Sequence, residues 1–344
     1  MNNPKVSVLV PIYGVEKYIE RCARSLFEQT FEDIEYIFVN DCTPDQSVEI
    51  LKNTLEEYKT VKSKVRIIQH DKNRGIAAVR NTCIENANGI YTLFVDSDDK
   101  VEKNMVELLF NKAIKENAEI VSCQYYFSYI DHEELKEEFF PKDLHQRMFN
   151  IISLNNSAFM WRLLIKKELY TNNKLRFIDG INVAEDYIMV SKLLYYARRI
   201  SYVDEPLYHY TKYNPQNYSQ LSIRNIEDRI NAAKELDLFF RASAIYDHIK
   251  EALDGRKFII KTVFILNNDY EDFDRWKRTF PESDYAWRLF YFRFDYKIIY
   301  WLAEKHMFKC IRLIKIAKST LSKINHLLKR LNALGWQEPA ALPV

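Results

Sequence analysis

Residues 91–99 have the sequence Tyr-Thr-Leu-Phe-Val-Asp-Ser-Asp-Asp, in which five β-favouring or apolar residues run directly into a turn with three carboxylates. The first half predicts a buried strand. In an open parallel α/β sheet, ligands bind at the carboxyl ends of the strands. The carboxylates of Asp96 and Asp98 are therefore expected at a ligand-binding edge of the fold.

Asp96 and Asp98 lie two residues apart, so their oxygens can point toward one place if the chain turns there. Carboxylates this close repel each other unless a cation lies between them. Mg²⁺ and Mn²⁺ are hard divalent ions that proteins commonly share with substrate phosphates. The alternative is a solvated acidic turn that caps the next helix, with Asp99 near its N-cap. This stretch alone leaves both interpretations open.

Strands and helices are expected to alternate on both sides of this stretch. The expected strands are 6–11, 34–39, 65–69, 91–95 and 120–126, and the expected helices are 15–29, 47–58, 76–86 and 101–116. Strict alternation with short loops predicts a doubly wound, mostly parallel α/β sheet. The strand-to-helix loops then share one edge, which brings Asp41, Asn73 and Arg74 toward Asp96 and Asp98.

After residue 130 the alternation stops. We expect a mobile acidic excursion at 131–143, a helix at 157–170 that contains Trp161, and a loop around Gly180. A further helix opens at Glu185 and Asp186, where carboxylates suit the helix dipole. A short strand is expected at 200–203, followed from about residue 222 by helices with breaks near 254–255 and 281.

The composition of the chain indicates its class of protein and excludes several kinds of site. A chain of 344 residues with 47% hydrophobic and 28% charged residues is typical of a soluble globular protein with two units. Its five cysteines show no CxxC spacing, and its six glycines form no phosphate-binding loop. No apolar run reaches membrane-spanning length, and no leader of signal-peptide type opens the chain. A nucleotide, if bound, would depend on metal and carboxylates.

Positive charge is concentrated near the C-terminus. Residues 286–332 contain eleven Lys/Arg against Asp295 and Glu304, which gives +9 and leaves −7 for the rest of a chain whose total is +2. Aromatic residues are interleaved with these cations, and from Cys310 apolar residues recur four and three apart. Such helices bind an anionic membrane surface or pair with another helix, as in a homodimer. The acidic body argues against nucleic acid.

Several motifs, taken in order, resemble the family 2 inverting glycosyltransferases, which have a GT-A nucleotide-sugar fold. The resemblance covers about residues 4–215 and rests on 6–14, the strand end at Asp41, 73–75 through 80–81, the turn 96–99, Glu185-Asp186, and 206–210. It implies a GT-A domain at 1–220. The pattern of the remaining sequence predicts a helical region at 221–285, basic aromatic amphipathic helices at 286–332 and a disordered tail at 333–344.

For the donor, the resemblance implies that Asp41 accepts a hydrogen bond from the nucleobase, with Pro11 and Tyr13 as walls. Asn73 belongs to the same nucleotide site, and Arg80 lies near the base or the diphosphate. The alternatives are that Asp41 only caps the next turn and that Arg80 is a solvated helix cation. The family often has a second Asp where this chain has Asn40, which leaves Asp41 in place.

For the metal, the resemblance implies that Asp96 contacts ribose and a Mn²⁺ or Mg²⁺ ion, while Asp98 binds that ion. The ion neutralises charge on the leaving group. His209 could supply a third ligand; the alternative is a hydrogen-bonded histidine between Tyr208 and Tyr210.

Inversion needs a base that deprotonates the acceptor hydroxyl opposite the leaving group. The resemblance implies Asp186 as this base, with Glu185 as the second choice, because consecutive helical residues point in different directions. The alternative is that both carboxylates only stabilise a helix N-terminus. Trp161 could stack on an acceptor sugar or pack under the acceptor loop.

The expected function is therefore an inverting hexosyltransferase that uses a nucleoside-diphosphate sugar, with UDP as the expected nucleotide. The acceptor would be a glycan or a lipid-linked glycan of a bacterial surface polysaccharide. The expected location is cytoplasmic, peripheral to the inner face of the membrane. The alternatives are a sugar-phosphate nucleotidyltransferase and a non-catalytic membrane-peripheral assembly protein.

Overall fold

A computed structural model describes residues 4–214, 222–289 and 293–317. The chain divides into two compact units, Met1–Arg256 and Lys257–Val344. The division falls within a long helix, α9, which spans Tyr246–Lys261. The candidate site lies wholly in the first unit.

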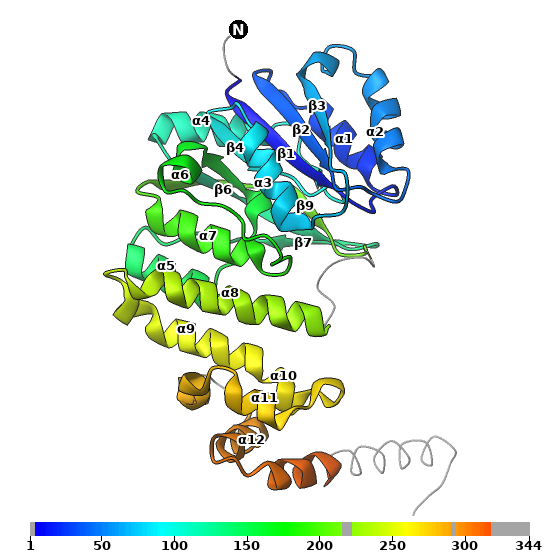
Figure 1. The fold of residues 1–344 in the computed structure, drawn as a ribbon. Coiled ribbons are helices and arrows are strands. Elements are labelled where there is room, and N and C mark those ends of the chain that lie inside the picture. Colours follow the sequence, from blue (N-terminus) through cyan, green and yellow to red (C-terminus); the bar gives the residue numbers. More distant parts are fainter. Residues whose placement is uncertain (1–3, 215–221, 290–292, 318–344) are drawn as a thin grey trace, which may run out of the picture. The chain divides into compact units, whose positions relative to one another are not determined.

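The first unit is built on one mixed sheet (Figure 1). Its strands are β1 Val6–Ile12, β2 Ile34–Asn40, β3 Val65–Gln69, β4 Tyr91–Phe94, β5 Lys100–Val101, β6 Ile120–Ser128, β7 Glu133–Lys136, β8 Leu163–Lys166 and β9 Ile200–Thr211. The order is β3-β2-β1-β4-β8-β6-β9-β5, with β7 beside β6. Strands β3, β2, β1 and β4 are parallel, as are β6 and β9, whereas β8 runs antiparallel to both its neighbours.

Helices cover both faces of this sheet because successive strand residues point to opposite sides. Val8 and Val10 of β1 pack in one core with α1, α2 and α4, while Leu9 packs in the other with α3 and α5 to α9. These helices are α1 Ile19–Phe27, α2 Ser47–Glu56, α3 Ile76–Asn86, α4 Met105–Glu116, α5 Leu144–Ile152, α6 Glu168–Asn172, α7 Glu185–Tyr196 and α8 Ile223–Arg241, followed by α9. The expected doubly wound, mostly parallel sheet with a helical C-terminal part is confirmed.

The helix expected at 157–170 is wrong. A short 3₁₀ turn at Met160–Arg162 leads into β8, and only Glu168–Asn172 is α-helical. Leu163, Leu164 and Ile165 are buried on both faces of the sheet, between β4 and β6. A run of apolar residues this short is compatible with either structure, and pairing on both sides selects the strand.

Three other boundaries also differ. The excursion at 131–143 contains β7, which pairs with β6. The short strand expected at 200–203 continues to Thr211, because β6 pairs with it along its length through a bulge near Gln124. The break expected at 254–255 is absent, since α9 continues through Gly255.

The second unit is helical in its described part. It contains α10 Val263–Leu266, α11 Phe273–Arg278, α12 Phe294–Glu304, the 3₁₀ turns Asn268–Tyr270 and Pro281–Leu289, and a helical stretch at residues 308–317. Its core holds the buried ammonium of Lys261, which pairs with Asp284 and lies over the ring of Trp276. The described residues include no helix with the length and hydropathy of a bilayer span. The tail expected at 333–344 lies outside the described residues, as do residues 290–292 and 318–332 of the segment 286–332.

Candidate functional site

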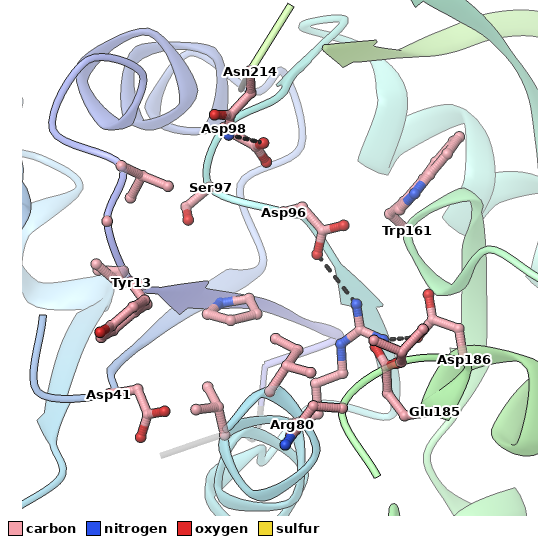
Figure 2. A pocket seen from close by; sticks show the side chains of 18 of the residues that line it. Tyr13, Asp41, Arg80, Asp96, Ser97, Asp98, Trp161, Glu185, Asp186 and Asn214 are labelled. Atoms are coloured by element: carbon pink, nitrogen blue, oxygen red, sulfur yellow. Dashed lines mark hydrogen bonds and ion pairs between the residues drawn. The ribbon is translucent and has the colours of Figure 1, made fainter. Parts of the chain in front are cut away.

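A pocket of about 460 Å³ opens where the strands of the first unit end. Nine of the ten residues proposed from the sequence line it: Pro11, Tyr13, Asp41, Asn73, Arg80, Asp96, Asp98, Glu185 and Asp186. Figure 2 shows Tyr13 and Asp41 on one side of this pocket, and Trp161, Glu185 and Asp186 on the other. The remaining residue, His209, is not part of its lining.

The acidic turn after β4 is held by the strand that follows α7 in the chain. The Tyr208 hydroxyl donates to Asp99 at 2.7 Å, and the Asp96 backbone N–H donates to the same hydroxyl oxygen at 3.1 Å. The Thr211 N–H donates to the second Asp99 oxygen at 2.6 Å. Burial and the neighbouring carboxylates raise the pKa of Asp99 well above its usual range. Asp99 is thus a buried anchor of the turn, and the alternative that it caps the next helix is wrong, because the N-cap of α4 is Asn104.

Asp98 is held from two other elements. The Asn214 amide donates to its carboxylate at 2.7 Å, and Arg21 of α1 donates to its backbone carbonyl at 2.8 Å. Burial, followed by the charge of Asp96, raises the pKa of Asp98. The raised pKa therefore reflects mainly the burial of this carboxylate, with the nearby charge of Asp96 as the second cause.

This donor set fits a divalent ion. Asp96 and Asp98 place two carboxylates at the pocket, and Mg²⁺ is typically held by one or two carboxylates together with substrate phosphates. Among the described residues, no group of three or more His, Cys, Asp or Glu could hold a metal ion by itself. An ion at the turn would therefore need ligands from the substrate or from water.

One buried cation, Arg80 of α3, faces three carboxylates. Its guanidinium lies 3.3 Å from Asp96 and 3.0 Å from Glu185, and it also pairs with Asp186 (Figure 2). The side chain is only 4% exposed, and the rings of Phe94 and Phe177 lie 5.6 Å from it. Arg80 therefore ties the acidic turn to the start of α7. It is not the solvated helix cation considered as an alternative.

Replacing Arg80 by Met is expected to lower the free energy of unfolding by roughly 3–5 kcal/mol, because it leaves three carboxylates facing one another without their shared cation. Urea unfolding measures the change. The matched control is Arg176→Met, since the Arg176 side chain is 64% exposed and pairs with Glu85 at the surface; it should cost less than about 1 kcal/mol. If Arg80→Met lowers the free energy of unfolding no more than the control does, Arg80 does not stabilise the fold by joining the three carboxylates.

The two carboxylates at the start of α7 differ in environment. Burial raises the pKa of Glu185 to about 7, with Arg80 offsetting part of this effect. The side chain of Asp186 is 19% exposed, against 11% for Glu185. The helix starts from Ala184, which has a left-handed conformation with φ of 69°. The chain thus turns sharply into α7 and presents both acids to the pocket.

The raised pKa of Glu185 predicts a pH dependence of stability. Between its ordinary value of 4.5 and about 7, the folded chain binds more protons than the unfolded chain, so the free energy of unfolding falls as pH rises through this window. The contribution is about 3 kcal/mol at most. Urea unfolding of wild type and Glu185→Gln, at about pH 5 and about pH 8, should show a smaller fall in the variant. An equal fall in the free energy of unfolding for wild type and Glu185→Gln would contradict the raised pKa of Glu185.

Asp41 organises the loop that opens α3. Its carboxylate accepts hydrogen bonds from the backbone N–H groups of Arg74 and Gly75, at 2.9 and 2.8 Å, and contacts the His70 ring at 2.7 Å. The side chain is 3% exposed. The structure thus gives Asp41 a role in shaping the pocket wall. Its role in nucleobase recognition stays a prediction.

Some lining residues come from segments that the sequence did not single out. Asn182 and Arg229 line the pocket, the second from α8. Asp228, also on α8, accepts the backbone N–H groups of Asn182 and Val183 at 2.8 and 3.0 Å. A side chain at Gly75 would lie 2.3 Å from Asn182. In the sequence, the only sign of this close approach between Gly75 and Asn182 is the glycine itself, which has a positive φ in the structure.

His209 lies among acidic side chains away from the pocket. Its two ring nitrogens contact Glu133 at 2.8 Å and Glu102 at 2.7 Å, and its ring stacks on Tyr126. Both nitrogens are therefore engaged by carboxylates. The geometry matches the hydrogen-bonded histidine given as the alternative, although its tyrosine neighbours in sequence are not its partners.

Trp161 belongs to an aromatic stack at the pocket wall. Its ring lies 4.2 Å from that of Tyr208 and 4.8 Å from that of Phe159, nearly parallel to both. Only 1% of the residue is exposed, although it contributes to the lining. Packing therefore accounts for most of its surface.

Comparison with known proteins gives a consistent result. The profile described as Glycosyl transferase family 2 matches residues 7–168. A Bacillus subtilis (strain 168) protein named uncharacterized glycosyltransferase EpsJ is 34% identical over 232 residues, which are 65% of this chain and 66% of that protein. The chain thus spans just under two thirds of that relative's length.

Two solved structures share the fold. S. aureus TarS 1–349 in complex with UDP-GlcNAc has a TM-score of 0.67 at 23% identity, covering 82% of this chain and 81% of that one. The mannosyltransferase PcManGT of Pyrobaculum calidifontis, in complex with GDP-Man and Mn²⁺, has a TM-score of 0.50 at 17% identity, covering 93% and 85%. At these identities the likeness concerns the fold alone.

Proposed function

Because the chain belongs to glycosyl transferase family 2, we propose that it transfers a sugar from a nucleoside-diphosphate sugar to an acceptor hydroxyl, with inversion and with the help of a divalent metal. The observation that carries this proposal is the placement of two kinds of carboxylate around one pocket. Asp96 and Asp98 lie on the acidic turn, and Asp186 lies at the start of α7 (Figure 2). Asp96 and Asp98 would hold the metal at the leaving group, and Asp186 would act as the base.

The donor would occupy the part of the pocket between β1, β2 and the acidic turn. Pro11 and Tyr13 would flank the nucleobase, with Asp41 and Asn73 at its edge. UDP is the nucleotide we favour, and the complex of the TarS structure with UDP-GlcNAc supports testing it first. GDP is the second choice, since PcManGT is described with GDP-Man.

Asp96 and Asp98 would hold Mn²⁺ or Mg²⁺. The ion, when bound, would neutralise negative charge on the diphosphate. Asn214 and Arg21 fix Asp98 in place, and Arg80 fixes Asp96, so the two carboxylates are oriented before any ligand arrives. The Mn²⁺ in the PcManGT complex supports the choice of metal.

Asp186 would accept the proton of the acceptor hydroxyl. It is the more exposed of the two acids at the start of α7, so an incoming hydroxyl reaches it more readily than Glu185. Its pairing with Arg80 holds its carboxylate at the pocket wall. Glu185 would remain a buried partner of Arg80 that positions the helix start.

The acceptor would be a glycan or a lipid-linked glycan in the synthesis of a bacterial surface polysaccharide. Such an acceptor places the enzyme in the cytoplasm, at the inner face of the membrane. The basic aromatic segment 286–332 and the amphipathic character of its sequence support a peripheral location.

A thermal-shift screen of UDP-, GDP- and dTDP-sugars, each with and without Mn²⁺, tests the donor proposal. We expect at least one nucleotide sugar to raise the melting temperature, and to raise it more when Mn²⁺ is present, because a ligand that binds only the folded state stabilises it. No shift with any nucleotide or nucleotide sugar would count against a donor pocket.

A further inference from the structure

The second unit exposes large apolar side chains along one face of α12. Phe294, Ile298 and Trp301 are 79%, 37% and 45% exposed, and their spacing of four and three residues places them on the same side of the helix. Ile299 and Leu302 are buried on the other side. This helix therefore shows an apolar face to solvent as well as to its own core.

The next helical stretch repeats this pattern. Leu313 and Ile316, three residues apart, are 66% and 63% exposed while Ile311 is fully buried, and Met307, in the turn between the two helices, is 42% exposed. We call the exposed faces of α12 and of residues 308–317 the apolar-basic surface. Scattered single apolar residues are normal on proteins, but here they recur at helical spacing on consecutive helices.

Cations outnumber acids beside these apolar residues. Residues 293–317 contain Arg293, Lys297, Lys305, Lys309, Arg312 and Lys315 against two acids. One of those acids, Glu304, already accepts hydrogen bonds from Arg288 at 2.8 Å and Trp287 at 2.8 Å. Arg293 pairs with Asp295, and Arg312 and Lys315 pair with Glu271. The positive charge beside the apolar residues therefore comes mainly from Lys305 and Lys309, which are both exposed.

We propose that the apolar-basic surface binds an anionic lipid bilayer from one side, without crossing it. Phe and Trp side chains insert at the boundary between headgroups and acyl chains, and Lys and Arg are attracted to anionic headgroups. A second copy of this chain fits less well, because a two-fold interface would bring the same cations together. Nucleic acid would leave Leu313 and Phe294 without apolar contacts. The inference identifies the surface behind the proposed peripheral location and is independent of the proposed glycosyl transfer.

Sedimentation of the full chain with sucrose-loaded vesicles tests this binding. Vesicles of phosphatidylcholine alone are compared with vesicles that also contain phosphatidylglycerol. We expect binding to the anionic vesicles, weak binding to the neutral ones, and weakening by salt. The fluorescence of Trp301, obtained by subtracting the spectrum of Trp301→Phe, should shift to shorter wavelength only when anionic vesicles are present.

Two variants separate the contribution of lysine charge to vesicle binding from that of the inserted apolar side chains. The double variant Lys305→Gln/Lys309→Gln should bind anionic vesicles roughly 25-fold more weakly, because each lysine contributes about fivefold. Phe294→Ser should also weaken binding, and since this side chain is 79% exposed, folding should be unaffected. The matched control is Lys52→Gln/Lys59→Gln, which removes two exposed lysines of the first unit and should leave binding unchanged.

Several results would overturn the proposal. These are equal binding to neutral and anionic vesicles, no binding to either, or equal weakening by the control pair. A wild-type dimer in light scattering that Phe294→Ser converts to monomer, without vesicle binding, would assign the surface to self-association. Retention by RNA but not by vesicles would assign it to nucleic acid. Nucleotide-sugar binding, measured on the same surface variants, tests the pocket separately. The membrane proposal and the glycosyltransferase proposal can therefore fail independently.

Discussion

The variant Asp98→Asn is expected to lose the metal-dependent part of nucleotide binding and to turn over its donor roughly 10²–10³-fold more slowly. The reason is electrostatic: the substitution keeps the size of the side chain and its contact with Asn214, but removes one of the two charges proposed to hold the ion. Losing one preorganised electrostatic group at a leaving group costs about this much. Calorimetric titration of UDP, with and without Mn²⁺, measures the binding part.

Asp131→Asn is the matched control for this variant. It removes a carboxylate that is 84% exposed and pairs with the neighbouring His132, so it should behave like wild type. If wild type binds UDP equally with and without Mn²⁺, and Asp98→Asn binds it equally well, the metal assignment fails.

The variant Asp186→Asn should separate binding from chemistry. We expect its affinity for the donor to stay close to that of wild type, because Asp186 lies across the pocket from Tyr13 and Asp41 (Figure 2). Turnover should fall by about 10²–10⁴-fold, the usual contribution of a general base. Isothermal titration gives the affinity, and release of the nucleoside diphosphate gives the turnover.

Glu185→Gln is the matched comparison, since it removes the adjacent carboxylate. We expect it to retain more turnover than Asp186→Asn, because Glu185 is the more buried of the two. Full turnover by Asp186→Asn together with a large loss in Glu185→Gln would transfer the role of base to Glu185.

The sequence predicted the parallel half of the sheet well because its strands are short apolar runs that end in turns. The rule that parallel strands present their carboxyl ends at one edge was then sufficient to bring Asp41, Asn73, Asp96 and Asp98 to one pocket. Both rules use local pattern and connectivity, which a single sequence contains.

Contacts between distant segments could not be predicted in this way. Asp99 is separated from Tyr208 by more than a hundred residues, and nothing near it in sequence indicates burial. The hydrogen bond from the Asn182 N–H, in the loop before α7, to Asp228 of α8 also joins segments that are distant in sequence. The strand β8 was missed because its pairing partners, rather than its own residues, decide its conformation.

The measurement that tests the central proposal most directly is release of nucleoside diphosphate from a panel of nucleotide sugars by the purified chain. We expect release from at least one donor, loss of that release when EDTA removes divalent metal, and recovery when Mn²⁺ is added back. Release from no donor, or release that EDTA leaves unchanged and that Asp98→Asn and Asp186→Asn both retain, would contradict a metal-dependent glycosyltransferase.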